Sequence, residues 1–147
     1  MDAKELIAFI RRHRWAVQAS TSLSGAAQAA VIGVAVNDNA ELCFDTNIPT
    51  RKCQNLRRDP RIAVVIGWDD QQTVQYEGIA DEPVGSELVA VKATYFAHFP
   101  DGRTRESWPD ITYFRVKPTW IRYSDFRGPS PKVIEFVRPD LTRRDRQ

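Results

Sequence analysis

Alternation between apolar and polar residues dominates the chain and predicts a protein built mainly of β-strands. The first segment differs, because Leu6, Ile7 and Ile10 follow helical spacing within residues 2–14. A second helical pattern occupies residues 85–99. Strand-like segments lie at residues 15–22, 29–36, 41–46, 61–68, 73–83, 111–116, 119–126 and 133–137, and Lys117–Pro118 is expected to break the strand around it.

Short turns separate most of these segments, which favours about six strands joined mainly by hairpins. Residues 29–36 are almost wholly apolar, which predicts a strand buried on both faces or lying against something flat. A short helix is expected after Asn47, its predicted N-cap, with an end at Asp59–Pro60. Because helices do not alternate with strands, we predict an α+β protein with an antiparallel six-stranded barrel and flanking helices.

The length of 147 residues predicts one domain over residues 1–147, with an N-terminal helix within residues 1–14 and a polar tail at residues 138–147. The net charge of +2 and the scattered arginine clusters do not indicate a nucleic-acid partner. Cys43 and Cys53 lack the spacing of a metal site or a disulfide framework. No long apolar run indicates a membrane span or a signal peptide, so we expect a cytoplasmic protein with no membrane partner.

Candidate chemistry is concentrated in the segment TNIPTRK, where a predicted strand ends and a helix begins. Thr46 and Thr50 offer hydroxyl groups, and the helix N-terminus offers free backbone N–H groups. Arg51 and Lys52 follow in the first turn, where the helix dipole disfavours cations by about 0.3–1 kcal/mol each. A bound organic phosphate would offset that cost, and ordinary turn and surface residues are the alternative interpretation.

The run FDTNIPTRKCQNLRRDPRIAVVIGW at residues 44–68, followed by TVQYEGIA at residues 73–80, resembles the FMN-binding split-barrel superfamily typified by pyridoxamine 5′-phosphate oxidases. The resemblance spans about residues 15–123 and is most specific over residues 44–80. It implies a split β-barrel that binds flavin mononucleotide (FMN). It also implies a homodimer with the cofactor at the interface, for which residues 110–123 are a candidate segment.

The resemblance also implies which residues contact the cofactor. Arg51 and Lys52 match the clamp on the FMN phosphate, and Thr50 matches the hydroxyl residue before it. Thr46 matches a threonine at the strand end beside the flavin, with Asp45 in place of the usual aromatic residue. The segment Ala30–Val31–Ile32 matches the strand whose backbone lies along the isoalloxazine edge. Thr73 matches a position where the oxidases often place a glutamine that touches the flavin, and Gln72, one residue away, takes that role if the register is shifted.

Two departures from the family pattern bear on the substrate. The oxidases carry an arginine or lysine on the strand near the flavin, but none occurs between Ser24 and Glu41. The C-terminal segment lacks the histidine of the substrate-phosphate site, so pyridoxamine-phosphate oxidase activity is not expected.

We predict instead an FMN-dependent oxidoreductase without metal, acting on a small-molecule substrate or a nicotinamide donor, and we identify no catalytic residue. The alternatives are a deazaflavin-dependent reductase, a protein that holds flavin or haem without turnover, and a structural dimer with an empty barrel.

Overall fold

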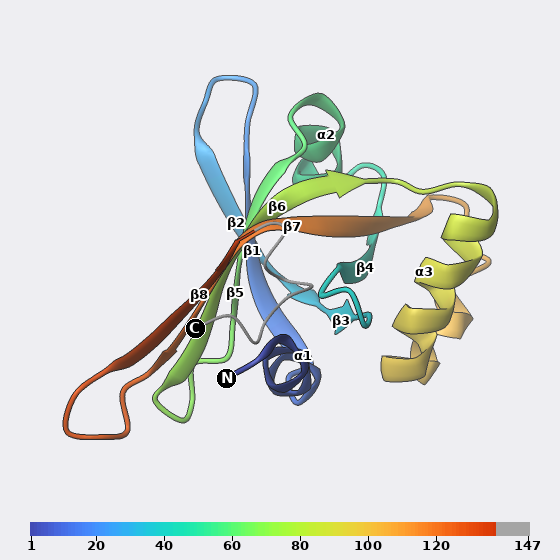
Figure 1. Ribbon diagram of the computed structural model, residues 1–147. Coiled ribbons are helices and arrows are strands. Elements are labelled where there is room, and N and C mark those ends of the chain that lie inside the picture. The colour runs from blue at the N-terminus through green and yellow to red at the C-terminus, as the bar shows by residue number, and fades with distance from the viewer. Residues whose placement is uncertain (138–147) are drawn as a thin grey trace.

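The computed structural model describes residues 1–137, so the predicted polar tail lies outside the described residues. Within them, eight strands form one curled antiparallel sheet flanked by helices (Figure 1). The strands are β1 (Trp15–Thr21), β2 (Ala27–Gly33), β3 (Ala35–Val36), β4 (Leu42–Asn47), β5 (Arg61–Ile66), β6 (Gln72–Asp81), β7 (Ile111–Asp125) and β8 (Lys132–Val137). The helices are α1 (Ala3–Arg11), α2 (Arg51–Arg58), α3 (Gly85–His98) and the 3₁₀ helix η1 (Pro100–Arg105).

The strand order explains why the sheet curls. It runs β2-β1-β5-β6-β7-β4-β3, and β8 pairs with the C-terminal part of β7, from Trp120 to Asp125. The outermost strands β2 and β3 are separated in the sequence by Val34 alone. The two edges of the sheet must therefore approach each other, which rolls the sheet into an open barrel.

The predicted α+β fold class is confirmed, although the described chain has eight strands where about six were expected. The expected break at Pro118 is wrong, because β7 continues through it. A bulge absorbs the proline: Gly78 pairs with Pro118 and Glu77 with Trp120, so that Thr119 is left over. A side chain at Gly78 would bring its Cβ to 2.5 Å from the Lys117 carbonyl oxygen, which explains the glycine at this close approach.

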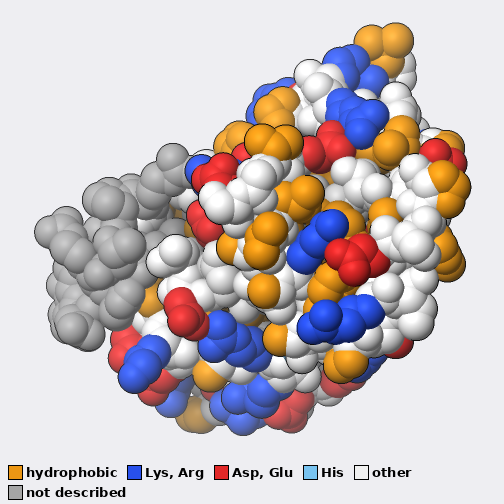
Figure 2. All heavy atoms as spheres, turned by 90° about the vertical axis from the view of Figure 1, so that its right-hand side faces the viewer, with side chains coloured by type: hydrophobic (Ala, Val, Ile, Leu, Met, Phe, Trp, Pro, Cys, Tyr) orange, Lys and Arg blue, Asp and Glu red, His pale blue; other side chains and the backbone are white. Residues whose placement is uncertain are grey.

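The main core fills the inside of the curled sheet. Phe44 and Phe114 stack there with ring centroids 5.5 Å apart, and α1 contributes Leu6 and Ile10. A second, smaller core lies on the outer side of β4 and β7, under the buried residues of α3. Figure 2 views the molecule from the α3 side, where acidic and basic side chains are interleaved.

The strand β2 is more exposed than the sequence predicts. Ala29 and Ala30 are exposed, and Val31 keeps 61% of its surface, so burial on both faces is wrong for the described chain. The reason is that β2 is an edge strand of the sheet. The other expectation, a small-residue strand lying against something flat, stays a prediction. Among residues 1–137, no helix is long and apolar enough to cross a membrane.

Candidate functional site

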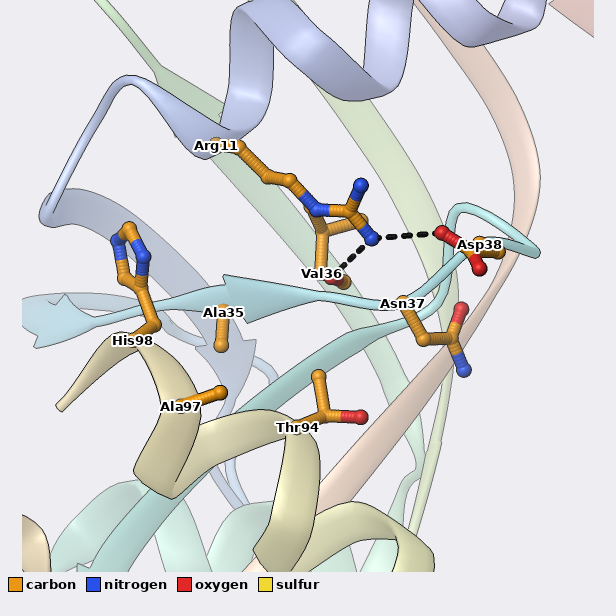
Figure 3. A pocket seen from close by; sticks show the side chains of 8 residues that line it. All are labelled: Arg11, Ala35, Val36, Asn37, Asp38, Thr94, Ala97 and His98. Atoms are coloured by element: carbon orange, nitrogen blue, oxygen red, sulfur yellow. Dashed lines mark hydrogen bonds and ion pairs between the residues drawn. The ribbon is translucent and has the colours of Figure 1, made fainter. Parts of the chain in front are cut away.

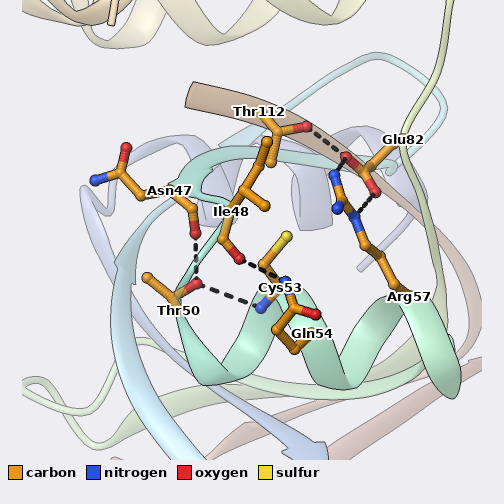
Figure 4. A network of polar contacts seen from close by, with 8 residues as sticks. All are labelled: Asn47, Ile48, Thr50, Cys53, Gln54, Arg57, Glu82 and Thr112. Carbon is orange, nitrogen blue, oxygen red and sulfur yellow. Dashed lines mark hydrogen bonds and ion pairs between the residues drawn. The ribbon is translucent and has the colours of Figure 1, made fainter. Parts of the chain in front are cut away.

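The turn between β4 and α2 is held by the hydroxyl group of Thr50. Thr50, rather than the predicted Asn47, is the N-cap of α2, because its Oγ1 accepts a hydrogen bond from the Cys53 N–H at 3.4 Å. The same hydroxyl donates to the Asn47 carbonyl oxygen at 2.8 Å (Figure 4). Asn47 remains the last residue of β4, so the turn from strand to helix occupies residues 48–50.

Thr46 joins this turn from the strand side. Its side chain is buried, and its Oγ1 lies 3.1 Å from Oγ1 of Thr50. Because the Thr50 proton is donated to Asn47, Thr46 is the donor in this pair. Thr46 therefore fixes the position of the N-cap and, through it, the direction of the free N–H groups of α2.

Arg51 and Lys52 are the first two residues of α2, and no acidic residue lies in its first turn. Within the described part of the chain, neither side chain has an ion pair or a hydrogen bond. The later cations of the helix are paired: Arg57 binds Glu82 at 2.7 Å, and Arg58 donates to the Thr21 carbonyl oxygen at 2.7 Å. Two free cations at a helix N-terminus are the arrangement expected of an anion site.

Partial burial lowers the pKa of Lys52 below its ordinary value of 10.5, and the nearby Cys53 and Asp45 oppose that shift. Burial thus disfavours the charged ammonium in the free protein. A bound anion would restore the lost interaction and raise the pKa again. The protonation of Lys52 would therefore be coupled to the binding of an anion.

A cavity of about 380 Å³ opens beside these cations, between the N-terminus of α2 and the inner face of β1 and β2. It brings together four of the predicted site residues, Ala30, Thr50, Arg51 and Lys52. Its remaining lining residues are Gln18, Ser20, Gln28, Ala29 and Pro49.

The polar wall of this cavity was not anticipated. Asn55 of α2 donates through Nδ2 to Ser20 Oγ at 3.1 Å and to Gln28 Oε1 at 2.9 Å, which ties the helix to β1 and β2. Gln18 lies on the same wall and is 1% exposed, yet its Oε1 has no hydrogen-bond partner among residues 1–137. Strand alternation in residues 15–22 contains the signal, since Gln18 and Ser20 share one face of β1.

Asp45 does not line the cavity, although its charge acts on Lys52. Successive residues of a strand face opposite sides, so Asp45 points under α3 while Thr46 points toward the barrel interior. Its carboxylate accepts hydrogen bonds from Arg105 Nε and from the Tyr95 hydroxyl, each at 3.0 Å. Burial, followed by the Asp45 charge, raises the pKa of Tyr95. Asp45 thus joins α3 and η1 to β4 through its hydrogen bonds with Tyr95 and Arg105.

Gln72 and Thr73 also lie away from the cations of the same chain, at the start of β6. The Tyr123 hydroxyl donates to Gln72 Oε1 at 2.7 Å, and Gln72 Nε2 donates to Asp70 at 3.0 Å. Gln72 lines a different hollow, which also includes Tyr123. Gln72 and Thr73 would lie beside the cavity lined by Arg51 only if a second chain contributed them.

The other two predicted residues lie on β2. Ile32 is buried in the core, and Val31 points outward with 61% of its surface exposed. In register with β1, Val31 lies opposite Val17 and Ala30 lies opposite Gln18. The segment therefore presents one small side chain to the cavity and one apolar side chain to the outer face of the sheet.

A separate hollow of about 390 Å³ lies between α1, β3 and α3 (Figure 3). Arg11 crosses it and binds Asp38 Oδ1 at 2.8 Å, so this cation is already neutralised. His98 lies at its other side, where its Nε2 is 3.1 Å from the His13 carbonyl oxygen. Its lining includes none of the predicted site residues.

Comparison with known proteins agrees with this architecture. The chain is similar in structure to a haem-binding protein from Mycobacterium smegmatis, with a TM-score of 0.83 and 16% identity over 97% of this chain and 61% of that one. A pyridoxamine 5′-phosphate oxidase-related, FMN-binding protein from Nostoc punctiforme gives a TM-score of 0.71 with 13% identity, over 94% and 90% of the two chains. HutZ, the haem storage protein from Vibrio cholerae, gives 0.70 with 14% identity, over 93% and 95%.

These identities establish the fold only, and the chain spans about three fifths of the Mycobacterium protein. No curated protein matches the chain by sequence. The family comparison is more decisive, because the pyridoxamine 5′-phosphate oxidase family matches residues 3–125, which include both walls of the cavity and the α2 N-terminus. The chain belongs to the pyridoxamine 5′-phosphate oxidase family.

Proposed function

We propose that the cavity beside α2 binds the phosphate of FMN and that the protein is an FMN-dependent oxidoreductase. The proposal depends on one observation: Arg51 and Lys52, at the N-terminus of α2, have no ion pair or hydrogen bond among the described residues. Arg51 offers a planar fork of donors to two phosphate oxygens, and Lys52 adds a compact charge. Thr50 supplies a hydroxyl group, and the first N–H groups of α2 supply backbone donors.

The residues of β1 and β2 fit a flat ring held next to that phosphate. Ala29 and Ala30 are small, so a ring can approach the backbone of β2 closely. When bound, the flavin supplies the redox chemistry, and the chain holds and orients it. Thr46 and Thr50 set the anchor, while the segment Ala30–Ile32 borders the ring. The structural neighbour from Nostoc punctiforme, an FMN-binding protein, supports this choice of cofactor.

Haem is the second candidate, since two structural neighbours bind or store it. The cavity supports it less well. Its described lining contains no histidine, cysteine, methionine or tyrosine to coordinate iron. A deazaflavin shares the phosphate handle and stays an alternative within the flavin class. A small-molecule substrate or a nicotinamide donor would react at the open face of the ring, and pyridoxamine phosphate is not proposed as the substrate.

The affinity for FMN tests this function through its dependence on pH. We expect binding to weaken below about pH 6, where the phosphate gains its second proton. Binding should weaken again as the pH rises through the lowered pKa of Lys52, because the free protein loses the proton that the complex needs. Quenching of FMN fluorescence, titrated from about pH 5 to about pH 10, measures both limbs. If FMN does not bind at neutral pH, the proposed function is refuted. If the affinity for FMN stays constant as the pH rises from neutral to alkaline, Lys52 does not contact the phosphate.

We also propose that the protein forms a homodimer through the outer face of β2, β1, β5 and β6. Val31, Val65 and Ile79 keep 61%, 39% and 40% of their surface exposed on this face, which no element of residues 1–137 covers. The apolar side chains of residues 110–123, the interface segment favoured by the sequence, largely pack inside the monomer. A second chain on this face could contribute Gln72 and Thr73 to the flavin.

The dimer is tested by Val31→Arg, which places a charge on the proposed contact. Sedimentation equilibrium should give a dimer for the unaltered protein and a monomer for Val31→Arg, with FMN affinity lowered as well if the cofactor lies at the interface. The matched control is Val89→Arg on α3, where the valine is 68% exposed on another face, and it should stay dimeric. A monomer for the unaltered protein would contradict the proposal.

A further inference from the structure

Gln18 is a buried polar residue whose hydrogen bonding is incomplete. It lies in the middle of β1, lines the cavity and is 1% exposed. No donor among residues 1–137 reaches its Oε1. An unpaired buried amide oxygen costs folding free energy, and native proteins keep few such groups.

The neighbours of Gln18 are already occupied or apolar. Ser20, two residues further along β1, and Gln28 on β2 both accept hydrogen bonds from Asn55. Ala30 is the register partner of Gln18 on β2 and offers no side-chain hydrogen bond. Ser20 and Gln28 thus each have a side-chain hydrogen bond, whereas the Gln18 carboxamide oxygen has none among residues 1–137, and Gln18 lines the same cavity as Arg51.

The chemistry of a carboxamide restricts what can pair with it. It accepts at oxygen and donates at nitrogen, and a rotation by half a turn exchanges the two. A hydroxyl group suits either orientation, because it both donates and accepts. A ligand anchored by its phosphate at Arg51 and Lys52 that carries hydroxyl groups near Gln18 would satisfy the wall.

We propose that Gln18 hydrogen-bonds a hydroxyl group of the ribityl chain of a ribityl phosphate such as FMN, and that it selects such ligands over haem. The inference rests on the proposed function, since Arg51 and Lys52 must hold the phosphate. Gln18 lies opposite Ala30, the first residue of the segment proposed to border the isoalloxazine ring. It is therefore placed between the proposed phosphate site and the proposed ring site, where the ribityl chain would run. Haem carries no hydroxyl group, and its propionate carboxylates only accept hydrogen bonds, so it offers no donor to the Gln18 carboxamide oxygen.

The test is Gln18→Leu, which keeps nearly the same volume and removes the carboxamide. We expect FMN affinity to fall about tenfold, the effect of one lost hydrogen bond at a buried site. Inhibition of FMN binding by inorganic phosphate reports on the anchor alone, and its constant should not change. The affinity for haemin should stay the same or rise. The apo variant should melt at a higher temperature, because an unpaired buried amide has been removed.

A purely structural role would give the opposite pattern, with a lower melting temperature and an equal loss of every ligand. That pattern, or an unchanged affinity for FMN, would overturn the inference. If Gln18→Leu does not fold, Gln18→Met provides an unbranched replacement for the same measurements. Failure of the proposed function is distinguishable, since the unaltered protein would then not bind FMN at all.

Discussion

Replacing Arg51 and Lys52 together by alanine is expected to lower the affinity for FMN by about 10²- to 10⁴-fold. Each charge-assisted contact to a phosphate contributes about 1.5–3 kcal/mol, and about 1.4 kcal/mol corresponds to a tenfold change. Both cations lack partners in the described chain, so their removal breaks no internal ion pair. The thermal stability of the apo protein should hold or rise, because two cations leave the positive end of a helix. Fluorescence titration and differential scanning fluorimetry measure the two effects.

The control is the double variant Lys4→Ala and Lys117→Ala, which changes the net charge equally. Both lysines are exposed and neither lines the cavity, so FMN affinity should remain close to that of the unaltered protein. An equal loss in both double variants would mean that FMN responds to the overall charge. Unchanged binding in Arg51→Ala plus Lys52→Ala would place the phosphate elsewhere.

Replacing Arg105 by methionine is expected to lower the free energy of unfolding by about 2–3 kcal/mol. Arg105 donates to Asp45 at 3.0 Å and to the Tyr95 hydroxyl at 3.1 Å, beneath α3. Without the guanidinium, the half-buried carboxylate of Asp45 keeps the Tyr95 hydroxyl as its one remaining side-chain donor among residues 1–137. Breaking such a pair from one side is costly because the remaining charge has lost its compensation. Urea denaturation followed by circular dichroism measures the change.

Arg103→Met in the same 3₁₀ helix is the matched control. Arg103 is exposed and lies 5.1 Å above the Phe96 ring, a contact whose loss should cost less than about 1 kcal/mol. The FMN affinity of folded Arg105→Met should change little, since Asp45 faces away from the cavity. A loss of affinity comparable to that of the Arg51 and Lys52 variant would assign the Asp45 carboxylate to the cofactor after all.

The strands and helices were largely predictable because their signal is local. Alternation placed β1, β4, β5 and β6 to within a few residues, and helical spacing placed α1 and α3. The predicted break at Pro118 was wrong because the prediction considered the missing N–H of proline but not the strand that pairs with it. Opposite Gly78, a bulge leaves the ladder continuous on both sides of the proline.

The anchor of the candidate site was predictable for the same reason. Thr46, Thr50, Arg51 and Lys52 lie within seven consecutive residues, and a strand end followed by a helix start brings them together in any fold. Asn47 and Thr50 are both good N-caps by type, and the choice between them depends on where the turn closes. The sequence pattern alone could not settle it.

By itself, then, the sequence determined most of the elements, the family and the cationic helix start, since these depend on periodicity and on neighbours along the chain. The tertiary structure decided which side chains complete the cavity. Gln18 joins Arg51 there across more than thirty positions of sequence, and Asp45 is drawn away by Arg105, sixty positions distant. Such contacts depend on strand pairing and on which face of the sheet a residue occupies, and both are settled only when the sheet curls.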